Sequence, residues 1–138
     1  MSEAETPVGT LGAHSQLLGT RLLGFDRETN TATVAFVARE EVCSSRGAVQ
    51  GGLVAGFLDE AMGLACIAST NGEAAPLNLE LSISLLKPIP AGAEFTGKGR
   101  VVRAGKRAIF LESELIAQDG TIYARATSTA LPSALPRG

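Results

Sequence analysis

The sequence predicts an α+β domain in which a curled antiparallel β-sheet surrounds one long, buried α-helix. The helix is indicated by residues 49–70, an apolar run whose large side chains are spread around the whole helical wheel, as in helices that are buried on every side. The sheet is indicated by residues 77–85, where leucine and isoleucine alternate strictly with polar residues. Because a flat sheet would cover only one side of such a helix, the sheet must curl around it, or a second subunit must cover the rest.

The part of the chain before the helix predicts one hairpin. Residues 1–12 contain Pro7, Gly9 and Gly12 without periodicity, so we expect a flexible N-terminal arm. The elements that we then expect are a short helix (14–18), a strand (19–25), a turn (26–30), a second strand (31–37) and a loop (38–48).

The part after the helix predicts four more strands. Asn71-Gly72 marks the end of the helix, because glycine readily adopts the left-handed conformation that follows helix C-termini. Asp119-Gly120 is a hairpin signal. We expect the four strands to form an antiparallel meander, with bounds of 77–85, 94–103, 107–117 and 122–131.

Length and composition fit one soluble domain. The 138 residues carry a net charge of −2, and we expect a single domain over 13–131 with a C-terminal tail over 132–138. A near-neutral charge argues against nucleic acid or a membrane surface as partner. The N-terminus has no apolar signal core, and Asp59-Glu60 interrupts the central helix too centrally for a membrane span. We therefore expect a cytoplasmic protein.

The two cysteines predict neither a disulfide nor a metal site. Cys43 and Cys66 are far apart and lack His or Cys neighbours at metal-ligand spacing. We expect free thiols and no metal.

Two features of the central helix could carry chemistry: the Gly51-Gly52 pair at its start and Asp59 in its middle. The first backbone N–H groups of a helix have no partner within it, and the helix dipole favours negative charge there. An acyl carbonyl at this end would meet an oxyanion hole. Alternatively, the glycines only allow a tight turn into the helix, and Asp59 and Glu60 only mark the one solvent-exposed edge of the helix.

Asp59 and Gly51 are too far apart to act on one carbonyl within one chain. Eight residues along a helix span about 12 Å, which an aspartate side chain cannot bridge. If both act together, they come from different chains. We therefore expect a two-fold dimer with antiparallel central helices and two composite sites.

The segment over residues 44–63, S-S-R-G-A-V-Q-G-G-L-V-A-G-F-L-D-E-A-M-G, resembles the hot-dog fold acyl-CoA thioesterases of the PaaI-like type, which belong to phenylacetate pathways and are related to 4-hydroxybenzoyl-CoA thioesterases. That family shows N-x-x-G-x-V-H-G-G, then an apolar stretch and an Asp nine residues after the His. The positions in register here are Gly47, Val49, Gly51, Gly52 and Asp59. Later strands also look like those of the family, so the resemblance covers roughly residues 15–131.

The resemblance implies hydrolysis of an acyl-CoA thioester with an aromatic or medium-chain acyl group, by a homodimer or homotetramer. Coenzyme A would be part of the substrate, and no other cofactor is implied. The N–H of Gly51 would polarise the carbonyl, and Asp59 of the other protomer would be the nucleophile or the general base. Gly52 and Gly63 would contact the substrate. Glu60 is the weaker candidate, because it points about 100° away from Asp59.

Three positions depart from the family pattern. Gln50 stands where the family usually has His, so it could position a group but not transfer a proton. Ser44 stands in place of an Asn or Gln, and Asn78 stands where a Ser or Thr usually holds the attacking water. The last two look like an exchange of amide and hydroxyl. His14, the only histidine, does not match the motif and is expected at the surface.

Cations gather around the hairpin over residues 100–107. Arg103, Lys106 and Arg107 are candidates for binding the phosphates of coenzyme A. The alternative is a solvated strand edge that is protected by charge.

Two further functions are open. A non-catalytic acyl-CoA sensor could use the same cleft, and Gln50 favours it while Asp59 argues against it. A hydratase or dehydratase would need an Asp/His pair, which His14 does not supply.

Overall fold

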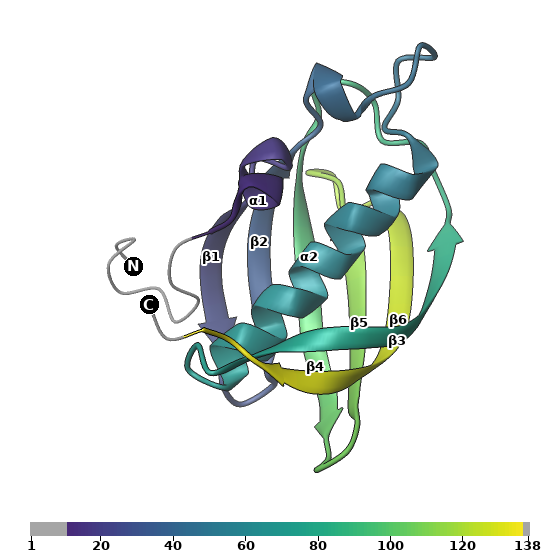
Figure 1. Cartoon of the computed structure of the whole chain (residues 1–138). Helices are drawn as coiled ribbons and strands as arrows, with labels where there is room; N and C mark the ends of the chain where they lie inside the picture. Colours follow the sequence, from purple (N-terminus) through teal and green to yellow (C-terminus); the bar gives the residue numbers. More distant parts are fainter. Residues whose placement is uncertain (1–10, 137–138) are drawn as a thin grey trace.

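The computed structural model describes residues 11–136, and in them a six-stranded antiparallel sheet curls around one long helix (Figure 1). This confirms the expected fold class. The predicted arm lies outside the described residues over 1–10, as does the predicted tail over 137–138. The elements are α1 (Ala13–Leu17), β1 (Arg21–Asp26), β2 (Thr31–Val37), a 3₁₀ turn (Glu40–Val42), α2 (Gly51–Ser69), β3 (Ala74–Leu85), β4 (Glu94–Ala104), β5 (Ile109–Ile116) and β6 (Ile122–Ala134).

The order of the strands differs from the predicted meander. Across the sheet the order is β1-β2-β4-β5-β6-β3. The prediction is wrong for β3, which pairs with β6 rather than with β4, while β4 pairs with β2. α2 runs diagonally across the sheet (Figure 1): it starts beside Leu85 at the end of β3, and β3 then runs back at the edge beyond β6. The connection after β3 then returns the chain to the middle of the sheet.

The element bounds follow the sequence patterns with two extensions. The second strand occupies residues 31–37 as predicted. However, β3 begins at Ala74, before residue 77, and β6 continues to Ala134, past residue 131. The extensions pair with each other, Ala74 with Ala134 and Pro76 with Pro132. Residues 132–134, predicted as tail, are therefore part of the sheet.

Both turn signals are confirmed. Asn71 and Gly72 follow α2 with φ of 55° and 85°, and Gly120 has φ of 90° in the turn between β5 and β6. The N–H of Gly72 donates to the carbonyl of Ile67 at 2.8 Å, so the end of α2 is capped by main-chain bonds.

The core lies between α2 and the inner face of the sheet. Phe57 of α2 is fully buried, and its ring meets those of Phe36 and Phe95 edge-on, with 5.0 Å between centroids in each pair. Such contacts between aromatic rings add about 1 kcal/mol each to the burial of their area. They fix the middle of α2 over β2 and β4.

Two glycines of β4 allow α2 to lie directly on the sheet. Gly97 and Gly99 are buried on the inner face of β4. A Cβ on Gly99 would overlap the backbone carbonyl of Ala61 and lie 2.8 Å from the nitrogen of Met62. The depth at which α2 sits therefore depends on the missing side chain at Gly99.

The length and composition of α2 would also suit a membrane span, with a mean hydropathy of 1.4. Half of that segment is buried inside the protein, and the sheet curls around it. An apolar helix in this position is a core helix.

Candidate active site

Asp59 lies in the middle of α2 on a partly buried face and contacts β3. Its Oδ1 accepts a hydrogen bond from Nδ2 of Asn78 at 2.6 Å. Its Oδ2 makes no hydrogen bond to the residues that the structure describes. The structure thus brings together two of the predicted site residues, with one carboxylate oxygen held and the other available.

The face of α2 around Asp59 is built from small residues. Gly56 and Gly63 lie about one turn before and after Asp59, and a Cβ on either would meet nothing within 4 Å. The helix surface at Gly56 and Gly63 is therefore open, on either side of the contact between Asp59 and Asn78.

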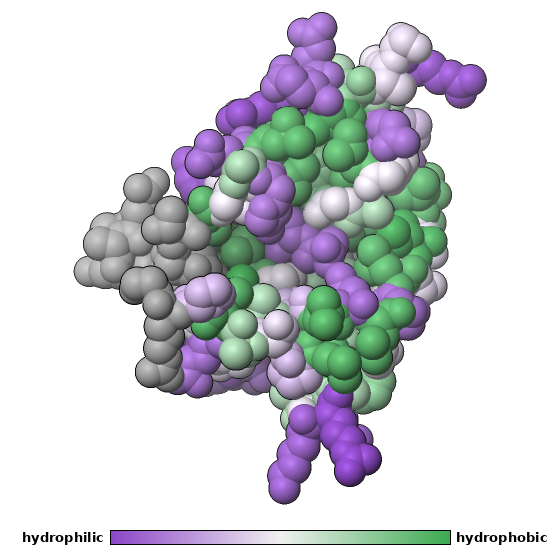
Figure 2. Space-filling view, in the orientation of Figure 1, coloured by the Kyte–Doolittle hydropathy of each residue, from purple (hydrophilic) through white to green (hydrophobic). Residues whose placement is uncertain are grey.

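Large apolar side chains are exposed beside this face, along β3 and just after it. β3 is an edge strand, and Figure 2 shows apolar surface on the side of the molecule where β3 runs. The most exposed members are Leu77, Leu79, Leu85 and Leu86, at 53–60%. Several large exposed apolar side chains on one edge strand are typical of interfaces.

The start of α2 presents backbone donors. Gln50 is the N-cap, and its Oε1 accepts the N–H of Leu53 at 3.0 Å. Gly51 and Gly52 are exposed, and their N–H groups donate no hydrogen bond within the described residues. A Cβ on Gly52 would lie 2.9 Å from Oε1 of Gln50, so this glycine leaves room for the cap. The helix start has the free donors that an oxyanion hole needs.

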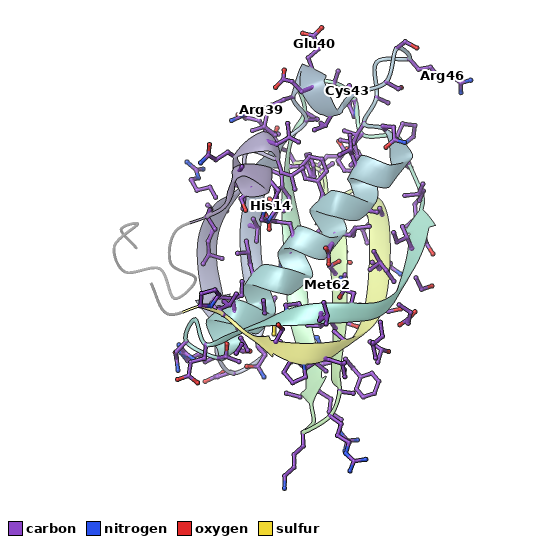
Figure 3. The ribbon with its side chains drawn as sticks, in the orientation of Figure 1. His14, Arg39, Glu40, Cys43, Arg46 and Met62 are labelled. Carbon is purple, nitrogen blue, oxygen red and sulfur yellow. The ribbon has the colours of Figure 1, made fainter. Side chains whose placement is uncertain are left out.

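Ser44 is not brought to Asp59 within the chain. It is exposed in the loop before α2, where its Oγ accepts the N–H of Arg46 at 3.3 Å. Figure 3 shows this loop, with Arg39, Cys43 and Arg46 labelled, beyond the start of the helix. The predicted residues therefore fall into two groups: Asp59 with Asn78, and the residues at and before the helix start.

Glu60 belongs to a separate cluster. It is only 8% exposed, and its Oε2 accepts the hydroxyl of Thr20 at 2.8 Å. Nε2 of His14 lies 3.4 Å from Oε1 (Figure 3). The side chain of His14 is 74% exposed, which confirms its surface position and adds a contact that the sequence did not predict. Glu60 joins α1 and the segment before β1 to the central helix.

The predicted phosphate-binding cations lie elsewhere on the protomer. Arg103, Lys106 and Arg107 are exposed around the β4–β5 hairpin, at the opposite end of the sheet from the start of α2 (Figure 1). None of them makes an ion pair with the residues described, whereas Arg100 binds Glu112 at 2.7 Å. The structure does not bring these three cations to Asp59 or Gly51 of the same chain.

A polar groove of about 1180 Å³ lies on the sheet face that points away from α2. Side chains of both charge signs line it, among them Lys98, Glu112 and Arg125, and it contains neither Asp59 nor Gly51. A groove with mixed charge offers no particular affinity for a phosphorylated ligand. The candidate site therefore lies on the face of the sheet that carries α2.

Both cysteines are free thiols among the described residues, as expected. Burial raises the pKa of Cys66 to about 11. Cys43 is partly exposed, and its thiol lies 3.3 Å from the carbonyl of Arg39. No cluster of His, Cys, Asp or Glu in residues 11–136 could hold a metal ion.

Sequence reasoning missed Ser128 of β6. Its side chain is 3% exposed, and its hydroxyl donates to Oδ1 of Asn78 at 2.9 Å. No motif marks it, but a signal was available. The inward positions of β6 are otherwise alanines, Ala124, Ala126 and Ala130, and a lone polar residue among them needs a partner.

Comparison with known proteins matches this chain to thioesterases. The family model described as the thioesterase superfamily matches residues 46–124, a segment that contains Gly51, Asp59 and Asn78. A protein of Saccharolobus solfataricus whose name assigns it as an esterase is 32% identical over 99 residues, which cover 72% of this chain and 69% of that protein.

Two solved structures show the same fold. The chain resembles a phenylacetic acid degradation-related protein of Ralstonia eutropha JMP134, described as a thioesterase, with a TM-score of 0.81, 29% identity and coverage of 89% of this chain and 92% of that one. It also resembles a Streptococcus mutans protein that was solved with bound acetyl-CoA, with a TM-score of 0.74, 20% identity and coverage of 86% and 91%. At 20% identity, the second similarity concerns the fold alone.

Proposed function

This chain belongs to the thioesterase superfamily and is a thioester hydrolase, and on that premise we propose that it hydrolyses an acyl-CoA with Asp59 as the reacting residue. The observation that carries the proposal is the 2.6 Å hydrogen bond from Asn78 to Asp59 on an uncovered face of α2. It orients one carboxylate oxygen and leaves the other for water or substrate. The acetyl-CoA on a relative of the same fold supports the substrate class.

The site is proposed to be shared between two protomers. Asp59 and the donors at Gly51 are separated by about 12 Å along the helix, so one chain cannot apply both to one carbonyl. The glycine-lined face of α2 and the apolar edge along β3 are open in the protomer. A second copy with its α2 antiparallel would cover both surfaces and bring its own Gly51 toward Asp59. The proposed state is a homodimer, and two dimers could form a tetramer.

The proposed reaction needs only groups that this arrangement supplies. Asp59 takes a proton from water as the water oxygen bonds to the thioester carbon. The carbonyl oxygen becomes an oxyanion, which the N–H groups of Gly51 and Gly52 stabilise by about 3 kcal/mol per donor. The C–S bond then breaks, and the proton on Asp59 passes to the departing thiolate. In the second form of the proposal, Asp59 attacks the carbon itself and the C–S bond breaks to release the thiolate, which leaves an anhydride. Water then hydrolyses the anhydride to the acid and the Asp59 carboxylate, and the proton that is released goes to the thiolate.

Gln50 and the hairpin cations complete the proposal. Since Oε1 of Gln50 caps the helix, its Nε2 is left to donate to the substrate carbonyl. Gly52 and Gly63 would allow the acyl group to approach the helix, and the aliphatic surroundings suit an aromatic or medium-chain acyl group. The phosphates of coenzyme A would be bound by Arg103, Lys106 and Arg107 of another protomer in the assembly.

Turnover of an acyl-CoA panel by wild type, Asp59→Asn and Asp59→Ala tests the proposal. We expect both variants to lose turnover by at least about 100-fold, as for removal of a general base, while still binding acyl-CoA. Glu60→Gln is the matched control, because it removes the adjacent carboxylate, which is turned toward Thr20. Equal turnover in the wild type and both Asp59 variants would exclude Asp59. Binding without turnover in the wild type would instead identify an acyl-CoA sensor.

A further inference from the structure

A β-bulge in β3 turns Asn78 toward the helix. Asn78 pairs with Ala130 and Glu80 pairs with Thr129, so Leu79 has no partner on β6. Leu79 is 60% exposed, whereas Leu81, two residues further on, packs against the core. Without the bulge, strict alternation would place Asn78 on the face of Glu80, away from α2.

Two hydrogen bonds from β6 to Glu80 hold the bulge. Oε1 of Glu80 accepts the N–H of Thr129 at 2.9 Å, and the carbonyl of Glu80 accepts the hydroxyl of Ser128 at 2.9 Å. The Glu80 side chain thus accepts a hydrogen bond from a main-chain N–H group that faces the bulge. The bulge is a fixed part of the sheet beside the site.

The hydroxyl of Ser128 also decides which way the Asn78 amide faces. An asparagine side chain presents an acceptor on one side and two donors on the other. The carboxylate of Asp59 can only accept, so Nδ2 has to face it. Ser128 has a single hydroxyl hydrogen, and its Oγ lies 2.9 Å from both Oδ1 of Asn78 and the carbonyl of Glu80, so these two acceptors share one donor. Both atoms near the hydroxyl, Oδ1 of Asn78 and the carbonyl of Glu80, are acceptors, which makes Ser128 a donor.

We propose that Ser128 is a positioning residue for the reaction: it fixes the amide of Asn78 so that Nδ2 always faces Asp59. Without it, only the bond to Asp59 holds the amide, so the side chain of Asn78 gains rotational freedom and Asp59 is oriented less tightly. This inference rests on the proposed role of Asp59. Ser128 itself acts only through Asn78.

A double-mutant cycle tests this coupling in the full-length protein. Ser128→Ala is expected to lower kcat roughly tenfold with KM unchanged, which is the upper end of the effect of losing one hydrogen bond between neutral groups. Asn78→Ala is expected to lower kcat by at least as much. The double variant should equal Asn78→Ala, because Ser128 has nothing left to orient. Ser128→Cys, similar in size but a poor donor, should repeat the loss.

Ser113→Ala is the matched control. Ser113 is 5% exposed on β5, and its hydroxyl donates to the carbonyl of Leu58 at 2.9 Å. This variant also loses one buried hydroxyl but does not touch Asn78, so kcat should stay near the wild-type value while stability falls similarly. Additive losses in the double variant, or wild-type kcat in both Ser128 variants, would overturn the inference. If Asp59→Asn retains full turnover, the proposed function itself fails.

Discussion

Gly99→Ala tests how the sheet positions the central helix. In β4, Gly99 faces α2, and an added Cβ would overlap the carbonyl of Ala61 and lie 2.8 Å from the nitrogen of Met62. Both atoms belong to the helix backbone and cannot rotate away. The variant can fold only if α2 moves away from β4, which also shifts Asp59, two residues before Ala61, relative to Asn78.

The expected loss of stability follows from this overlap. Overpacking a core costs about 1–3 kcal/mol, and contact with backbone favours the upper end, about 3 kcal/mol. For a domain of this size, each kcal/mol lowers Tm by about 3–4 °C, so we expect a fall of about 10 °C. At Gly97, the nearest obstacle is the ring of Phe36, a side chain that can adjust, so Gly97→Ala should cost less.

Thermal unfolding followed by circular dichroism measures this effect, with acyl-CoA turnover measured in parallel. Gly24→Ala is the matched control, because Gly24 also lies in a strand, in β1, but its added Cβ would meet nothing within 4 Å. Its Tm should stay near the wild-type value. Equal Tm for Gly99→Ala and Gly24→Ala would refute the close contact between α2 and β4.

Two further predictions concern the cysteines and the open face of α2. Burial raises the pKa of Cys66 from 9.0 to about 11, so the unfolded chain loses this proton first as pH rises. The free energy of unfolding should be unaffected well below pH 9 and fall by about 2 kcal/mol by pH 11. Chemical denaturation across this range should show a smaller fall in Cys66→Ala, and parallel curves would contradict the prediction; at neutral pH, iodoacetamide should modify Cys43 and spare Cys66. Gly56→Met places a long side chain where the protomer has open space, so the far-UV circular dichroism of the folded protomer should be unchanged. Size-exclusion chromatography should show loss of the proposed dimer, with a lower Tm because the interface is lost and with lower turnover. An unchanged dimer with full turnover would refute a shared site on this face.

The central helix could be predicted from sequence because its apolar composition requires a buried position. A run with apolar side chains on every side of the helix has to be covered on every side. The alternation of the strands and the turn signals at Gly72 and Gly120 are likewise local properties of the chain. Such properties depend on backbone conformation and on the hydrophobic effect, both of which can be read from neighbouring residues.

The order of the strands could not be predicted in the same way. The four strands after the helix carry patterns that would also suit a meander, because pairing β3 with β4 or with β6 satisfies the same backbone groups. Which pairing forms depends on where the chain lies after α2, and in the structure β3 lies at the edge beyond β6. The short distance between α2 and Gly99 was missed for a similar reason, since a glycine in a strand does not show what approaches it.

The candidate site was partly visible in the sequence. The glycines at the start of the helix and the eight-residue distance to Asp59 can be read from the sequence, and they predict a site shared between two chains if both groups act on one carbonyl. The cap made by Gln50 and the contact of Glu60 with Thr20 depend on side-chain directions, which the sequence did not fix.

The position of Asn78 separates what the sequence determined from what only the tertiary structure decided. Strict alternation over residues 77–85 determined a strand with one apolar and one polar face, and it placed Asn78 on the polar face with Glu80. Pairing with β6 introduced the bulge at Leu79, which turned Asn78 inward to Asp59 and left Leu77 and Leu79 exposed. A bulge arises from the register between two strands, and Ser128, the residue that completes this contact, lies fifty positions away in the chain.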